Sequence, residues 1–120
     1  MHDFNGMAGR YIQVWNETDP LRRRTLIAAS WVEDADYRDP MATVAGHQGI
    51  ESLIAGVQQK FPGLRFRLLG VPDGHGDRFR FRWGLGPADS DPVAEGTDFA
   101  VLASDGRLAS VTGFIDRMPG

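Results

Sequence analysis

The sequence predicts an α+β fold in which a curved antiparallel sheet wraps around three helices as a cone-shaped roll. Two observations lead to this prediction. The first half of the 120 residues carries apolar side chains at helical spacing, whereas the second half alternates apolar and charged residues with the period of a strand. A sheet with one apolar face must bury that face against a second layer, and the helices supply it.

Three segments are expected to be helical. The first spans about residues 6–17, where apolar side chains recur every three or four positions. The second begins at Asp19-Pro20, an N-cap followed by a first-turn proline, and extends to about residue 33. The third follows Gly46 and ends before Pro62-Gly63.

Six strands are expected to form the sheet. Two short ones, residues 36–39 and 43–46, flank a turn that contains Asp39. Two more follow from residue 64 onward, where apolar residues alternate with arginines, as in Phe79-Arg80-Phe81. The last two, residues 93–103 and 107–116, are joined by a short glycine-containing hairpin segment.

Size and composition limit the function. A chain of 120 residues is expected to form one domain, residues 1–120 with a core at about 5–116, that buries roughly two-thirds of its unfolded surface. The absence of cysteine excludes disulfides and thiolate chemistry. A net charge of -3 argues against a nucleic-acid partner. Without a signal peptide or an apolar run of about 20 residues, we expect a cytoplasmic protein with no membrane partner.

Asp39 is the first candidate for chemistry. It precedes Pro40, and a residue before proline is pushed away from helical angles, so Asp39 is expected at a strand end or turn that can aim its carboxylate into a cavity. The alternative is that it only binds nearby backbone amides of the turn.

Asp98 is the second candidate. By the period of two, it shares one strand face with Gly96, Ala100 and Leu102. If that face lines the cone, burial should raise the pKa of Asp98. The alternative is an outward position with an arginine partner.

The order of elements and several short motifs resemble those of the nuclear transport factor 2-like superfamily, whose fold is a cystatin-like cone. These motifs are the Asp39-Pro40 turn, the helix start Gly46-His47-Gln48-Gly49-Ile50, Gly96-Thr97-Asp98 and Asp105-Gly106-Arg107-Leu108. The resemblance covers about residues 5–116 and extends to the SnoaL-like group, which includes ketosteroid isomerases and polyketide cyclases. It implies an enzyme that removes a proton next to a carbonyl group without any cofactor.

The resemblance also implies roles for individual residues. Asp39 would be the base, and Tyr11 and Asp98 would donate hydrogen bonds to the oxygen on which charge develops. Asp116, near the end of the last strand, matches the acid/base aspartate of the cyclases and is a secondary candidate. Relatives with this fold are commonly dimers, so a homodimer formed through the outer sheet face is expected.

The expected ligand is a small apolar molecule that carries a carbonyl group. The histidines lack the spacing of a metal site, so no metal is expected. The aromatic side chains are first of all core, and those expected to line a pocket as well are Trp15, Trp31, Phe61, Phe66, Phe81 and Trp83.

Two other functions remain open. The first is a non-catalytic small-molecule-binding or dimerisation module in which the acids are structural. The second is epoxide hydrolysis or dehydration, which would require an arginine–aspartate pair or paired histidines. An open apolar cavity that ends at Asp39 and Asp98 would favour the proton-transfer enzyme, whereas a cone filled with aromatic side chains would favour the module.

Overall fold

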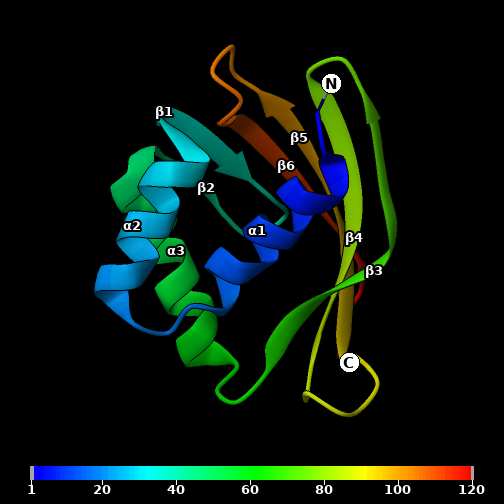
Figure 1. Cartoon of the computed structure of the whole chain (residues 1–120). Helices are drawn as coiled ribbons and strands as arrows, with labels where there is room; N and C mark the ends of the chain where they lie inside the picture. Colours follow the sequence, from blue (N-terminus) through cyan, green and yellow to red (C-terminus); the bar gives the residue numbers. More distant parts are fainter. Residues whose placement is uncertain (1, 120) are drawn as a thin grey trace.

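The computed structural model describes residues 2–119, which form three helices and a six-stranded sheet (Figure 1). The α+β class and the three helices on the inner side of a curved sheet are confirmed. The elements in chain order are α1 (Phe4–Asn16), α2 (Pro20–Ser30), β1 (Trp31–Arg38), β2 (Thr43–Ala45), α3 (Gly46–Lys60), β3 (Arg65–His75), β4 (Arg78–Gly86), β5 (Ala94–Leu102) and β6 (Leu108–Arg117).

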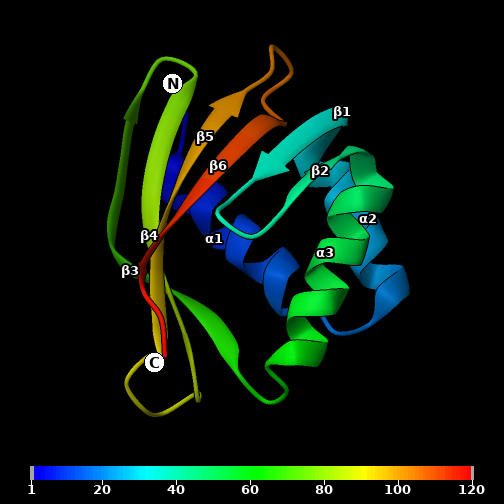
Figure 2. The ribbon, with the colours of Figure 1, turned by 180° about the vertical axis from the view of Figure 1, so that it is seen from behind.

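The sheet has the strand order β2-β1-β6-β5-β4-β3, and it curves around the helices without closing (Figure 2). Four of the neighbouring pairs are antiparallel, but β1 and β6 run parallel. The sheet is therefore mixed, which corrects the purely antiparallel expectation. No hairpin connects β1 to β6, so chain connectivity does not force them to be antiparallel.

The second helix ends earlier than its sequence pattern predicts. It stops at Ser30, and Trp31 begins an eight-residue strand instead of the last helical turn. Trp31, Ala35 and Tyr37 of this strand are buried. Tertiary burial of these side chains outweighs the local helical pattern.

Local interactions fix the helices in place. Asp3 and Asp19 cap α1 and α2, as each carboxylate accepts a hydrogen bond from a backbone N–H three residues later. The guanidinium of Arg23 is buried and makes two hydrogen bonds to the Glu51 carboxylate, at 2.8 and 2.7 Å, which joins α2 to α3. Removing either partner would leave a poorly solvated charge, so this pair holds the two helices together.

The inner and outer faces of β5 follow the period of two that the sequence shows. Gly96, Asp98, Ala100 and Leu102 are buried, whereas Phe99 between them is exposed. The core packs aromatic and branched side chains from the helices against this inner face. Within residues 2–119, no helix is long and apolar enough to cross a membrane.

Candidate functional site

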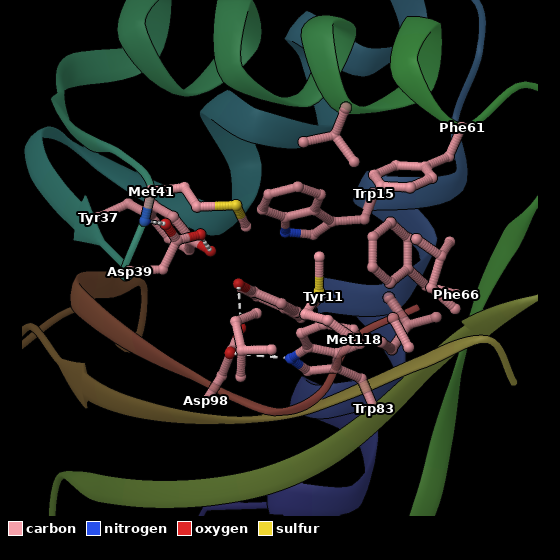
Figure 3. A pocket seen from close by; sticks show the side chains of 15 residues that line it. Tyr11, Trp15, Tyr37, Asp39, Met41, Phe61, Phe66, Trp83, Asp98 and Met118 are labelled. Carbon is pink, nitrogen blue, oxygen red and sulfur yellow. Dashed lines mark hydrogen bonds between the residues drawn. The ribbon is translucent and has the colours of Figure 1, made fainter. Parts of the chain in front are cut away.

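A small pocket opens between α1, α3, the β1–β2 turn and the inner face of the sheet (Figure 3). Its volume is about 70 Å³, well below the roughly 300–1,000 Å³ of pockets for drug-sized ligands. Most of its lining is apolar, and four of the six aromatic residues expected there contribute: Trp15, Phe61, Phe66 and Trp83. The space accommodates a few water molecules or a ligand of a few heavy atoms.

Asp98 lies at the polar end of this pocket and is only 3% exposed. The Tyr11 hydroxyl donates a 2.6 Å hydrogen bond to its Oδ2, and the Trp83 indole N–H donates a 3.0 Å bond to its Oδ1. Burial raises the pKa of Asp98 to about 6, the nearby charge of Asp39 adds to this, and the two hydrogen bonds oppose it. The acid can therefore gain or lose a proton near neutral pH.

A glycine allows Trp83 to reach Asp98. Trp83 on β4 stands opposite Gly96 on β5, two residues before Asp98. A Cβ atom at Gly96 would overlap the indole ring of Trp83. The indole ring of Trp83 therefore packs directly on the backbone of β5 at Gly96, and its N–H lies beside the Asp98 carboxylate.

Two tyrosines provide the hydroxyl groups of the pocket. Tyr11 comes from α1 and Tyr37 from β1, and both are almost fully buried. Burial is the main cause that raises the pKa of each tyrosine well above 10, and the negative charge of Asp98 raises both further. Both phenols are therefore protonated at neutral pH and can serve as hydrogen-bond donors.

Asp39 is half-buried at the start of the β1–β2 turn and lines the same pocket. Its Oδ1 accepts hydrogen bonds from the backbone N–H groups of Met41 and Ala42, at 2.8 and 2.9 Å. Its Oδ2 accepts a 2.7 Å hydrogen bond from the Tyr37 hydroxyl. The carboxylate thus anchors the turn, as the structural alternative expects, and is also held in a fixed position at the pocket wall.

The two acids converge on one glycine of β6. A Cβ atom at Gly113 would lie 3.0 Å from Oδ1 of Asp98, 3.3 Å from Cβ of Asp39 and 3.4 Å from the Tyr37 hydroxyl. Any larger residue would push apart the groups that meet there. Gly113 therefore allows both carboxyl groups to line a single small cavity.

Three predicted site residues lie elsewhere. Asp116 is exposed, and its Oδ2 accepts a 2.7 Å hydrogen bond from the Thr97 hydroxyl on the outer side of the sheet. Trp31 and Phe81 are 0% and 2% exposed and belong to the core rather than to the pocket lining. The open end of the cone therefore exposes only part of the inner aromatic layer.

Sequence reasoning missed Tyr37, Met41 and Met118. Tyr37 had a usable signal, because a residue two positions before Asp39 in a strand shares its face. Met41 and Met118 are 62% and 41% exposed at the pocket mouth, and their turn and chain-end positions gave no comparable signal.

The ionisable groups that line the pocket are acids and tyrosines. Its lining includes two carboxylates but, among the residues that the structure describes, no lysine, arginine or histidine. The neighbouring Arg38 and Arg117 pair with Asp36 and Glu95 instead. Over residues 2–119, no group of three or more metal-binding side chains is found.

Comparison with known proteins identifies relatives over most of the chain. The family model of the SnoaL-like domain matches residues 8–111. No curated protein matches the sequence. A crystal structure from Agrobacterium tumefaciens, of a protein provisionally described as an isomerase of the SnoaL-like family, has 46% identity and a TM-score of 0.90, and the match covers 94% of this chain and 97% of that chain.

Two more distant structures share the fold. A protein from Catenulispora acidiphila with a ketosteroid isomerase-like fold, in complex with trimethylamine, has 14% identity and a TM-score of 0.74, with 92% of this chain and 85% of that chain covered. A protein from Jannaschia sp. CCS1, provisionally described as a SnoaL-like polyketide cyclase, has 14% identity and a TM-score of 0.71, with 97% and 90% covered.

Proposed function

The chain belongs to the SnoaL-like domain family, and we propose that it is an acid–base enzyme that moves a proton next to the carbonyl group of a small, uncharged, apolar substrate. The observation that carries this proposal is the buried Tyr11–Asp98 pair, with its 2.6 Å hydrogen bond, at the polar end of an otherwise apolar pocket. The description of the 46% identical relative as an isomerase supports the same reaction class.

In this proposal, Asp39 is the base. Its carboxylate accepts the proton when the substrate C–H bond breaks, and the electron pair forms a carbon–carbon double bond as the carbonyl becomes an enolate. Tyr11 and protonated Asp98 then donate hydrogen bonds to the enolate oxygen. Return of the proton to another carbon gives isomerisation, and attack of the enolate on a second carbonyl group gives ring closure.

The protonation of Asp98 matters because Tyr11 has a single hydrogen. When Asp98 is ionised, Tyr11 donates that hydrogen to the carboxylate and has none left for the substrate. When Asp98 carries a proton, both groups can face the substrate oxygen. The donor form of the site therefore exists below the pKa of Asp98, about 6, unless the bound substrate raises that pKa further.

Charge and size narrow the substrate. Two acids without a cation among the described lining residues repel carboxylates and phosphates, so an anionic substrate is disfavoured. The volume of about 70 Å³ favours a substrate of few atoms. The trimethylamine complex of the Catenulispora protein provides an example of so small a ligand bound to this fold.

The direct test is hydrogen exchange in cyclopentanone. In deuterium oxide the protein should accelerate exchange of the protons next to the carbonyl group, followed by proton NMR. Asp39→Asn should slow this reaction by roughly 100- to 10,000-fold, because a positioned base contributes about that much. Asp116→Asn, on the outer face, serves as the matched control and should leave the rate within about twofold of the original protein.

The pH profile separates the roles of the two acids. If Asp98 acts as a donor, kcat/KM should fall as pH rises through about 6, because the donor loses its proton. If kcat/KM instead rises through the same pH, Asp98 is the base and the assignment of Asp39 is wrong. Exchange no faster than in buffer would contradict the enzymatic proposal.

A second candidate is a non-catalytic binding module for small neutral molecules. The observation in its favour is that all three hydrogen bonds to Asp39 come from its own strand and turn. Saturable binding of cyclopentanone without proton exchange would support this candidate.

A further inference from the structure

Trp15 carries a buried hydrogen-bond donor that none of the roles above uses. The side chain is 6% exposed and lines the pocket, and its indole N–H finds no acceptor with suitable geometry among residues 2–119. A buried donor without a partner costs about 1–3 kcal/mol. Such groups are rare in folded proteins and call for an explanation.

Trp31 offers an internal comparison. Its indole N–H is also buried without an acceptor in the described part of the chain. The rings of Trp15 and Trp31 both pack on Tyr11, with centroids 6.1 and 5.9 Å from the phenol ring. Only Trp15 also lines the pocket, so the two tryptophans are matched in packing and differ in their relation to the site.

The Trp15 nitrogen lies on the side of the indole that faces the Tyr11 hydroxyl (Figure 3). Consistent with this position, the Trp15 side chain acts to lower the pKa of Tyr11, against the larger upward effects of burial and of Asp98. The N–H therefore points toward the Tyr11 side of the pocket, and no hydrogen bond joins the two groups in this structure.

The Tyr11 oxygen has acceptor capacity to spare. The Tyr11 hydroxyl donates its hydrogen to Asp98. The lone pairs of the Tyr11 oxygen can still accept a hydrogen bond, and in the resting state Trp15 does not provide one. When Tyr11 donates to an enolate oxygen, negative charge spreads onto the phenol oxygen. Hydrogen bonds to charged acceptors are shorter and about twice as strong as those to neutral ones.

We propose that Trp15 is a positioning residue of the proton-transfer site, whose indole N–H hydrogen-bonds to the Tyr11 oxygen when the reaction places charge there. The inference rests on the proposed function, because it assumes that Tyr11 donates to the substrate oxygen. An interaction that is weak in the resting state and strong in the transition state is the kind that raises kcat. Trp83 provides the corresponding donor for Asp98, so each member of the Tyr11–Asp98 pair has an indole of its own.

The kinetic test compares Trp15→Phe with Trp31→Phe, which replaces another buried indole whose N–H also finds no acceptor among the described residues. With cyclopentanone exchange as the assay, Trp15→Phe should lower kcat by about 10- to 100-fold, as expected for loss of a charge-assisted hydrogen bond, and leave KM nearly unchanged. Trp31→Phe should change kcat by less than about threefold. An unchanged kcat with a raised KM in Trp15→Phe, or equal losses of kcat in both variants, would overturn the proposal.

A second measurement needs no substrate and no tryptophan substitution. Tetrafluorotyrosine, a much stronger acid than tyrosine, is incorporated into the Tyr37→Phe protein so that position 11 alone carries the fluorinated phenol. As pH rises, fluorine NMR reports the ionisation of this phenol, and the nitrogen–proton spectrum reports the indole groups. The Trp15 indole proton should move downfield with the same midpoint as the fluorine signal, and the Trp31 proton should not.

The absence of this coupled shift, up to the pH at which the protein unfolds, would overturn the positioning role of Trp15. The spectroscopic result does not depend on turnover. A coupled shift in a protein that exchanges no ketone protons would therefore support the contact between Trp15 and Tyr11 while contradicting the proposed function.

Discussion

The two faces of strand β5 place acids in opposite environments three residues apart. Glu95, on the outer side, pairs with Arg82 at 2.9 Å and with Arg117 at 2.8 Å. The hydrogen bond from Arg117 is the main cause that lowers the pKa of Glu95. Asp98, on the inner side, has no cationic partner within residues 2–119, and burial raises its pKa to about 6.

The difference shows that the environment sets the chemistry of a carboxyl group. The outer face offers arginines and solvent, so Glu95 stays ionised at neutral pH. The inner face offers aromatic rings and two neutral donors, so its acid can exist in either protonation state. A shift toward neutral pH is what acid–base catalysis requires, and only the inner face provides it.

The largest expected effect is on activity. Asp98→Ala should lower the rate of ketone proton exchange by roughly 100- to 1,000-fold, as does the loss of one oxyanion donor. Glu95→Ala on the outer face should leave the rate within about twofold of the original protein. Equal losses of kcat in both variants, measured in the same assay, would show that the two faces of β5 do not differ in their effect on catalysis.

The second effect is on stability as a function of pH. The folded protein holds the Asp98 proton more tightly than the unfolded chain does, so the contribution of Asp98 to the free energy of unfolding falls as pH rises from about 4 to about 6 and is then constant. Asp98→Asn removes this loss, which amounts to about 3 kcal/mol above pH 6 at 1.36 kcal/mol per pKa unit.

Urea unfolding at pH 4 and at pH 8 measures this difference. Asp98→Asn should be clearly more stable than the original protein at pH 8 and about equally stable at pH 4. Glu95→Gln should behave in the opposite direction, with a small loss of stability at pH 8 that shrinks as pH falls. Unfolding of Asp98→Asn at both pH values would show that the carboxylate is needed for structure.

The third effect concerns the inner surface that positions Trp83. Gly96→Ala should cost about 1–3 kcal/mol, because the new methyl group overlaps the indole ring. Gly56→Ala is the matched control, since no atom lies within 4 Å of the methyl group it would add on α3. That variant should gain up to about 1 kcal/mol from helix propensity. Thermal unfolding of the two variants gives the comparison, and equal stabilities would mean that the indole moves aside freely.

The smallest expected effect is on assembly through the outer face. Phe114 and Phe99 are 55% and 38% exposed on neighbouring strands of that face, and we propose that they lie in a homodimer interface. Phe114→Lys should weaken association at least about tenfold, as loss of an interface aromatic does. Light scattering at tens of micromolar should show a dimer for the original protein. A monomer there would contradict the proposal.

The sequence alone determined the periodic features of this protein. Alternation in β3, β4 and β5 identified which residues share a face, and it grouped Asp98 with Gly96 and Ala100 on one face of β5. The structure shows that this is the inner face. Asp19-Pro20 predicted the start of α2, and the residue pattern predicted the α+β class. These features depend on neighbours in the chain, whose geometry the backbone fixes.

Only the tertiary structure decided which inner residues form the site. Trp15 and Trp31 both looked like candidate lining residues, yet one lies at the open end of the cone and the other in its core. The parallel pairing of β1 with β6 brought Tyr37 and Asp39 beside Gly113, which no local pattern indicates. The period of a strand shows which side chains share a face. How far along the cone a side chain lies, and which strand pairs with its own, depend on contacts between distant segments. Such contacts leave no periodic pattern in the sequence.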